Sequence, residues 1–286
     1  MKGERLDVRK TYKLYIGGAF PRSESGRTYP ALDRKKRVVA RPARASRKDL
    51  RDAVRAARGA WKGWAEGTAY NRGQVLYRVA ELMEGRREQF VHELEIGGTR
   101  DAGAEVEAAI DRWVWYAGWA DKIHHVIGTV NPVAGPYFDF TFPEPTGVVG
   151  VVSPEEPALL GLVSRLAPVI VSGNTAVVLA SERAPLSAVT LCEVLATSDV
   201  PGGVVNVLTG VKTELIPWLA SHMDVNAVDL TGVPDHLIAE VEAAAAGNVK
   251  RTVRGGSADF LDEVAQSPYD IIDFMEMKTV WHPMGA

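Results

Sequence analysis

Apolar residues between positions 46 and 124 recur every three or four residues, which is the spacing of one helix face. Ser46 and Asp49 open the first such stretch in the arrangement of a helix capping box. The pattern predicts three helices: one from Ser46 through Trp64, one over residues 72–95 and one over residues 104–124. Short strands and turns are expected before them, over residues 12–40.

From Gly147 onward, short apolar runs alternate with helical stretches. The runs occupy residues 148–152, 176–179, 204–207 and 225–230. Helices are predicted at residues 158–171, 186–196, 216–220 and 237–246. Short β-branched runs separated by helices are typical of a parallel sheet with both faces covered. The predicted fold class is therefore α/β, a Rossmann-like doubly wound parallel sheet that follows an N-terminal helical segment.

Residues 131–144 follow neither pattern. Four aromatic side chains, Tyr137, Phe138, Phe140 and Phe142, lie in an extended stretch bounded by prolines. Aromatic residues favour strands, and this stretch suits a strand exposed enough to pair with another segment or chain.

Composition narrows the function classes. The chain has 286 residues, 46% hydrophobic and 24% charged, with a formal net charge of −3. Nucleic-acid and anionic-membrane binders need a basic surface, so neither partner is expected. The charged start, Met1 to Arg5, is followed by no apolar run, which predicts no secretion signal. One cysteine makes no internal disulfide, and a cytoplasmic location is expected.

Several ordered motifs resemble the aldehyde dehydrogenase superfamily. Tyr12 to Gly18 is similar to its opening segment, and Tyr116 to Lys122 to the helix before its oligomerisation hairpin. Pro136 to Val151 resembles that hairpin and the first strand of the NAD-binding domain, and Gly202 to Val207 resembles a later strand. Met277 to Trp281 is similar to the family's last strand. Because so many matches occur in order, the resemblance is specific.

The resemblance implies a domain organisation. Residues 1–127 and 148–256 would form an NAD-binding-like domain, and residues 128–147 with 268–286 a small β oligomerisation element made of a hairpin and the C-terminal strand. In the family, a catalytic domain on the order of 200 residues lies between the end of the NAD-binding domain and the last strand. Here a short linker, residues 257–267, takes its place. The chain is therefore expected to be a shortened, catalytically degenerate family member.

The family's reaction needs a thiolate, an oxyanion donor and a general base. By resemblance, Glu156 holds the position of the oxyanion-binding asparagine, and an ionised carboxylate has no proton to donate. The segment Arg251 to Gly256 lacks the glutamate that serves as general base in the family. Cys192, the only cysteine, lies on an apolar helical stripe and is expected to be structural. No catalytic residue is therefore predicted.

The matched cofactor positions are also altered. Leu179 stands where the family has a ribose-binding lysine, although the glutamate three positions on is kept as Glu182. In the phosphate-binding turn, Val233 replaces a serine, Pro234 lacks an N–H, and Leu237 replaces a glycine. No bound cofactor is expected. The six histidines show no metal-ligand spacing, so no metal is expected either.

Three hypotheses follow. The first is a non-catalytic subunit that assembles with a full-length aldehyde dehydrogenase as a structural or regulatory partner. Its predicted interface residues are Tyr137, Phe138, Phe140, Phe142, Lys278, Val280 and Trp281. The alternative is a residual NAD(P)-binding oxidoreductase module of aldehyde metabolism. The third is a decayed product with no role, against which the intact hydrophobic periodicity argues.

Overall fold

The computed structural model describes residues 8, 10–255 and 259–285. Its largest sheet has five parallel strands in the order β7-β6-β5-β8-β9. Their bounds are β5 (Val148–Val152), β6 (Thr175–Leu179), β7 (Val205–Leu208), β8 (Ala227–Asp229) and β9 (Arg251–Val253). The predicted α/β fold is confirmed. The apolar pattern missed β9, because this strand is short and two of its residues are polar.

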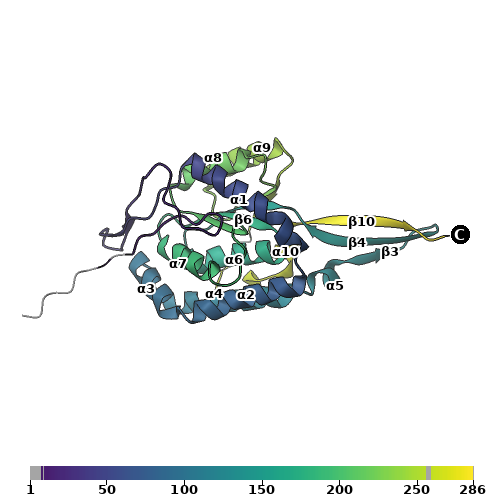
Figure 1. Cartoon of the computed structure of the whole chain (residues 1–286), viewed down its shortest axis with the longest axis horizontal. Helices are drawn as coiled ribbons and strands as arrows, with labels where there is room; N and C mark the ends of the chain where they lie inside the picture. The colour runs from purple at the N-terminus through teal and green to yellow at the C-terminus, as the bar shows by residue number, and fades with distance from the viewer. Residues whose placement is uncertain (1–7, 9, 256–258, 286) are drawn as a thin grey trace, which may run out of the picture.

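Side chains alternate across the sheet and contribute to two cores. One core contains Val149 and Val151 together with α2 (Ala69–Glu84), α4 (Ala102–Trp119), α6 (Ala158–Val171) and α7 (Leu186–Leu195). The other contains Val148 and Val152 together with α1 (Arg47–Glu66), α8 (Lys212–Ser221) and α9 (Asp235–Ala246). Both faces of the sheet are therefore covered by helices, as Figure 1 shows.

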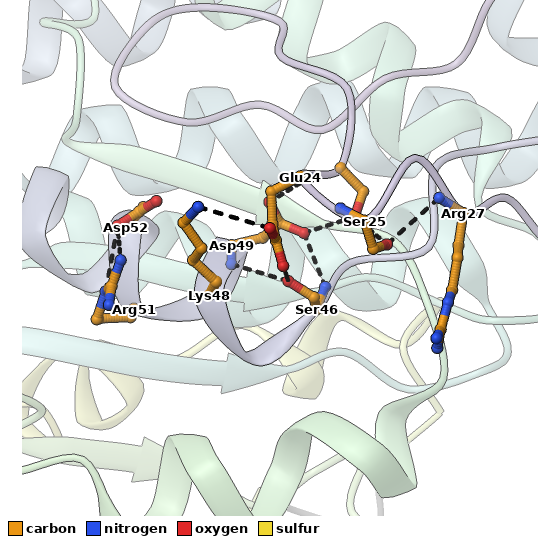
Figure 2. Close-up of polar contacts among 9 residues, drawn as sticks. Glu24, Ser25, Arg27, Ser46, Lys48, Asp49, Arg51 and Asp52 are labelled. Carbon is orange, nitrogen blue, oxygen red and sulfur yellow. Dashed lines mark hydrogen bonds and ion pairs between the residues drawn. The ribbon is translucent and has the colours of Figure 1, made fainter.

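Helix α1 begins where the sequence predicts. The Ser46 hydroxyl accepts the Asp49 N–H at 3.3 Å, and the Asp49 carboxylate accepts the Ser46 N–H at 2.8 Å, which completes the capping box. Asp49 also accepts from the Ser23 hydroxyl and the Glu24 N–H. The cap therefore ties the preceding loop to the helix, as the contacts in Figure 2 illustrate.

Two predicted helices are each divided in the structure. The single helix expected over residues 72–95 is wrong: α2 ends at Glu84, and α3 (Arg87–Gly97) begins after Gly85. Glycine is a poor helix former, and the Gly85 N–H caps the end of α2. The helix expected over residues 104–124 likewise divides into α4 and α5 (Ile123–Ile127). Apolar spacing continues through both breaks, so it did not reveal them.

The segment before α1 packs along one sheet edge. Tyr15 forms an antiparallel bridge to Val207 of β7, and the chain then turns at Gly17 and Gly18. Gly18 has a positive φ, and a Cβ there would lie 2.9 Å from the Cα of Gly202. This turn therefore requires glycine. A two-stranded hairpin follows, β1 (Ala31–Leu32) with β2 (Val38–Ala40).

A second, antiparallel sheet projects from the body of the molecule (Figure 1). It contains β3 (Thr129–Asn131), β4 (Tyr137–Pro145) and β10 (Met275–Pro283), and we call these three strands the arm. β10 pairs with β4 along its whole length. The aromatic strand expected to pair elsewhere is therefore the central strand of the arm, and the edges are β3 and β10.

The chain between β9 and β10 is short. Residues 257 and 258, the start of the predicted linker, lie outside the described residues, as does Gly256. We call residues 259–274 the bridging segment; it contains a 3-10 turn (Glu263–Ala265) and α10 (Pro268–Ile272). None of the described helices is long and apolar enough to cross a membrane.

Candidate functional site

In open parallel sheets, ligands bind at the carboxyl ends of the strands, where the strand order reverses. Here the reversal lies at β5, between β6 and β8. We call the loops at residues 153–157, 180–185, 209–211 and 230–234 the carboxyl edge. The resemblance places a dinucleotide at this edge. The side chains and backbone groups found there therefore determine whether a dinucleotide could bind.

A buried lysine fills the carboxyl edge. The Lys212 side chain is only 3% exposed, and its Nζ donates to the Ser153 carbonyl and to the Glu155 carboxylate. The backbone N–H of Lys212 donates to the Glu182 carboxylate. Glu155 also accepts from the Ser181 hydroxyl at 2.9 Å. Groups from the loops after β5, β6 and β7 thereby form one network.

The charges of this network are paired within the chain. Burial alone would raise the pKa of the Glu155 carboxyl, but the Lys212 ammonium and the other donors hold that pKa below its ordinary value. Burial lowers the pKa of Lys212, and the nearby carboxylates offset only part of that effect. Glu155 is therefore ionised at neutral pH and is already engaged, which makes it unsuited to general acid–base work.

Four helices, α6, α7, α8 and α9, start at the carboxyl edge, and helix N-termini bind phosphates through their free N–H groups. At α6, the buried Glu105 carboxylate accepts two backbone N–H groups, at 2.7 and 3.3 Å. At α8, Glu182 accepts the first N–H. At α9, the capping residue is Pro234, which has no N–H, and Asp235 adds a negative charge. The N-termini of α6, α8 and α9 are thus satisfied internally or unfavourable for an anion.

The loops after β5 and β8 are in direct contact. The Gly232 N–H donates to the Val152 carbonyl at 2.8 Å, and a Cβ at Gly232 would lie 1.9 Å from the Ser153 carbonyl oxygen. Val233, next in sequence, is buried in the core. The two backbones therefore leave no room for a group between them.

The predicted site positions lie in different surroundings. Glu156 is exposed and pairs with a neighbouring arginine at 3.0 Å. Leu179 and Val233 are buried in the core of α1, α8 and α9. Glu182 caps α8. Glu155 and Glu156 bind different partners, so these adjacent carboxylates do not converge on one substrate position.

Cys192 is buried in α7 and donates to the Ala188 carbonyl of the same helix. Burial raises the pKa of the Cys192 thiol well above its ordinary value, so the thiol stays protonated and is a poor nucleophile. In the described part of the chain, no three His, Cys, Asp or Glu side chains gather where they could hold a metal ion.

The arm has one apolar face. Phe138, Phe140 and Phe142 alternate along β4, and successive ring centroids lie 5.5 and 6.0 Å apart. Directly opposite them on β10 are His282, Val280 and Lys278. Val130 of β3, opposite Phe140, is largely exposed. This face therefore presents aromatic and aliphatic groups that the chain itself covers only in part.

The other face of the arm is mostly polar. The Asn131 amide donates to Asp139 at 2.9 Å and to Thr141 at 2.8 Å, and the hydroxyls of Thr141 and Thr279 lie 2.8 Å apart. These bonds link all three strands. The predicted interface residues divide between the faces: Phe138, Phe140, Phe142, Lys278 and Val280 on the apolar face, and Tyr137 and Trp281 on the polar one.

Sequence reasoning missed Lys212 and Glu105. Each is an ordinary charged residue by sequence, and its partner at the carboxyl edge lies 57 or 54 positions away. Glu155 was the one residue whose sequence position pointed to such a network. A carboxylate next to a buried strand end requires a cation or several donors, but nothing in the sequence indicates which cation.

Residues 21–258 match the aldehyde dehydrogenase family. The chain is 36% identical over 262 residues to aldehyde dehydrogenase family 2 member B4, mitochondrial, of Arabidopsis thaliana, covering 87% of this chain and 47% of that protein. A putative aldehyde dehydrogenase from Burkholderia cenocepacia has a similar structure, with a TM-score of 0.82 and 29% identity over 86% of this chain and 51% of that one. For the NAD+ complex of the Bacillus cereus aldehyde dehydrogenase the TM-score is 0.80 at 26% identity, with the same coverage.

The chain spans about half the length of these relatives. The family match includes the parallel sheet, the surrounding helices, β3 and β4, and it ends before the bridging segment and β10. From the extent of this match and the shared fold, the chain belongs to the aldehyde dehydrogenase family.

Proposed function

We propose that this chain is a non-catalytic subunit that assembles with a full-length aldehyde dehydrogenase, as a structural or regulatory partner. The observation that carries the proposal is the internal network at the carboxyl edge. Lys212 donates through its side chain to Glu155 and through its backbone N–H to Glu182, at the edge where the resemblance places a dinucleotide. A dinucleotide that displaced the side chain of Lys212 or Glu155 would break a largely buried ion pair, which is costly.

The arm supports the assembly half of the proposal. Its apolar face and its edge strand β10 are open within the described residues. Open strand edges and exposed apolar faces mark surfaces that pair with another chain. We propose that residues 1–127 and 148–256 form the NAD-binding-like domain and that the arm is the oligomerisation element. In this proposal the element comprises residues 128–147 and 268–286, and Ile271 and Phe274 near the start of its C-terminal part are buried in the body.

The alternative function is a residual NAD(P)-binding module. It draws support from the Bacillus cereus relative, which was solved as an NAD+ complex, and from the retained Glu182. Against it, Glu182 already accepts the Lys212 N–H. The two functions differ in one measurable property, the affinity of the isolated chain for NAD or NADP.

The proposal is tested with an affinity-tagged chain expressed in the cells it comes from. We expect a full-length aldehyde dehydrogenase, identified by its peptide masses, to co-purify in fixed ratio. The isolated chain is expected to oxidise no aldehyde and to release no heat with NAD in calorimetry. Micromolar binding of NAD by the chain alone would instead favour the residual module. Recovery of the chain without any such subunit would contradict the assembly.

We also propose a cytoplasmic location, on the basis of a single cysteine in the whole chain. One relative is named as mitochondrial. Fractionation of cells that express the tagged chain decides between the two compartments.

A further inference from the structure

The bridging segment is held by a buried arginine from α4. Arg112 donates through one Nη to the Ala265 carbonyl at 2.8 Å and to the Ser164 hydroxyl at 2.7 Å, and through the other to the Phe260 carbonyl at 2.8 Å. Its residue exposure is only 3%. A charged donor that is buried against two carbonyls of one short segment fixes the path of that segment.

A second buried arginine holds the end of the segment. Arg165 of α6 pairs with Asp229 at 2.5 Å and with Asp270 at 3.1 Å. Tyr116 donates to the other oxygen of Asp270 at 3.2 Å. Breaking such a buried pair is costly, so α10 is held against α6.

The fixed path divides the apolar residues of the segment into two groups. Ile271 and Phe274 point inward and are fully buried, whereas Leu261, Val264 and Tyr269 are 54%, 72% and 73% exposed. Turning those three side chains inward would require the segment to give up its bonds to Arg112 and Arg165. The segment therefore exposes three large apolar side chains within nine positions, and exposed apolar groups that gather into one patch mark interaction sites.

The segment runs directly into the arm. The Phe274 carbonyl accepts from the Thr146 hydroxyl at 2.8 Å and from the Asn174 amide at 2.7 Å, and β10 begins at the next residue. The exposed acidic residues near the three apolar ones are Asp259, Asp262 and Glu263. A complementary partner surface is therefore apolar and bordered by lysine or arginine.

We propose that Leu261, Val264 and Tyr269 form a second contact surface for the same full-length aldehyde dehydrogenase subunit that takes the arm. This inference rests on the proposed function. The occupant is that subunit because the surface and β10 are consecutive in the chain, and the Phe274 carbonyl at their junction is fixed by Thr146 and Asn174. Arg112 and Arg165 act as positioning residues, since they touch the segment and not the partner.

The test compares two matched triple variants in titrations with the purified full-length subunit identified by co-purification. The first carries Leu261→Ser, Val264→Ser and Tyr269→Ser. The control carries Leu32→Ser, Val38→Ser and Tyr77→Ser, which changes the same residue types at 40%, 46% and 52% exposure. We expect at least tenfold weaker binding for the first variant and less than a twofold change for the control. Equal binding by both variants and the wild type overturns the inference but leaves the proposed function intact.

Failure of the wild-type chain to bind the full-length subunit overturns the proposed function, and the inference with it. A photo-cross-linking side chain at position 264 provides a second measurement that needs no loss of binding. It is expected to cross-link to the full-length subunit, while the same group at position 38 does not. Cross-links only to a second copy of this chain contradict the choice of partner.

Discussion

The carboxyl edge of the parallel sheet and the arm are built in opposite ways. At the edge, the ionisable groups Lys212, Glu155 and Glu182 and the N-termini of α6 and α8 are satisfied inside the chain. On the arm, the aromatic face is only partly covered and β10 has no neighbour on its outer side among the described strands. The first region pairs its charged groups within the chain, whereas the second leaves a strand edge and apolar side chains open.

The two regions therefore satisfy their polar groups by different means. At the carboxyl edge, hydrogen bonds from Lys212 engage Glu155 and Glu182 while β5, β6 and β8 keep their parallel register. At a strand edge this is not possible, because the backbone donors and acceptors need another strand. We therefore expect damage to the arm to affect assembly, and damage to the edge to affect stability.

The largest effect is expected from ending the chain after Met275. This removes nearly all of β10 but keeps Phe274 and Met275, which are buried in the body. Binding to the full-length subunit should fall below detection in a titration, because both the strand edge and Trp281 are lost. The melting temperature of the body should change by only a few degrees, since the parallel sheet is untouched. Normal binding by the truncated chain would show that β10 is not needed for binding to the full-length subunit.

The next effect is expected from Lys212→Ala. This change leaves Glu155 partly buried without its cation, and we expect a loss of about 2–3 kcal/mol in the free energy of unfolding, measured with urea. This expected loss is at the low end of, or below, what breaking a fully buried ion pair costs, because the Glu155 side chain is 34% exposed. The matched control is Lys62→Ala, whose pair with Glu66 is exposed, and it should cost less than about 0.5 kcal/mol. Equal losses would show that the edge is not held by this ion pair.

A smaller, pH-dependent effect is expected from Glu155→Gln. The pKa of Glu155 is lowered in the folded chain, so its stabilising charge is fully present above the ordinary value of 4.5 and is lost as the pH falls below it. The wild type should exceed the variant by about 1 kcal/mol at neutral pH, after allowance for partial exposure. The gap should close as the pH falls below 4.5 in acid unfolding curves. A gap that widens on acidification contradicts the assigned ion pair.

The smallest effect is expected at Cys192. Its thiol is buried and its pKa is raised, so iodoacetamide should label it at neutral pH only after unfolding. Mass spectrometry of the treated protein measures this directly. Rapid labelling of the folded chain would mean that a nucleophile has been overlooked in the body.

The sequence predicted the α/β order and the arm strands well, since apolar runs such as 148–152 and the aromatic alternation at Phe138, Phe140 and Phe142 are local signals. It missed the break at Gly85 because the apolar spacing continues across it. It missed the strand β9 because that strand is short. It could not predict the pairing of Lys212 with Glu155 or of Arg165 with Asp270. Such pairs join residues more than 50 positions apart, and only the folded chain brings them together.

Native mass spectrometry of the complex purified from cells, with NAD added, determines whether this chain assembles with full-length subunits and whether it binds NAD. It counts subunits and bound dinucleotides in one spectrum. We expect an assembly of this chain with full-length aldehyde dehydrogenase subunits, in which the number of bound NAD molecules does not exceed the number of full-length subunits. An assembly that contains only this chain, or one in which each copy of it carries its own NAD, would contradict the account.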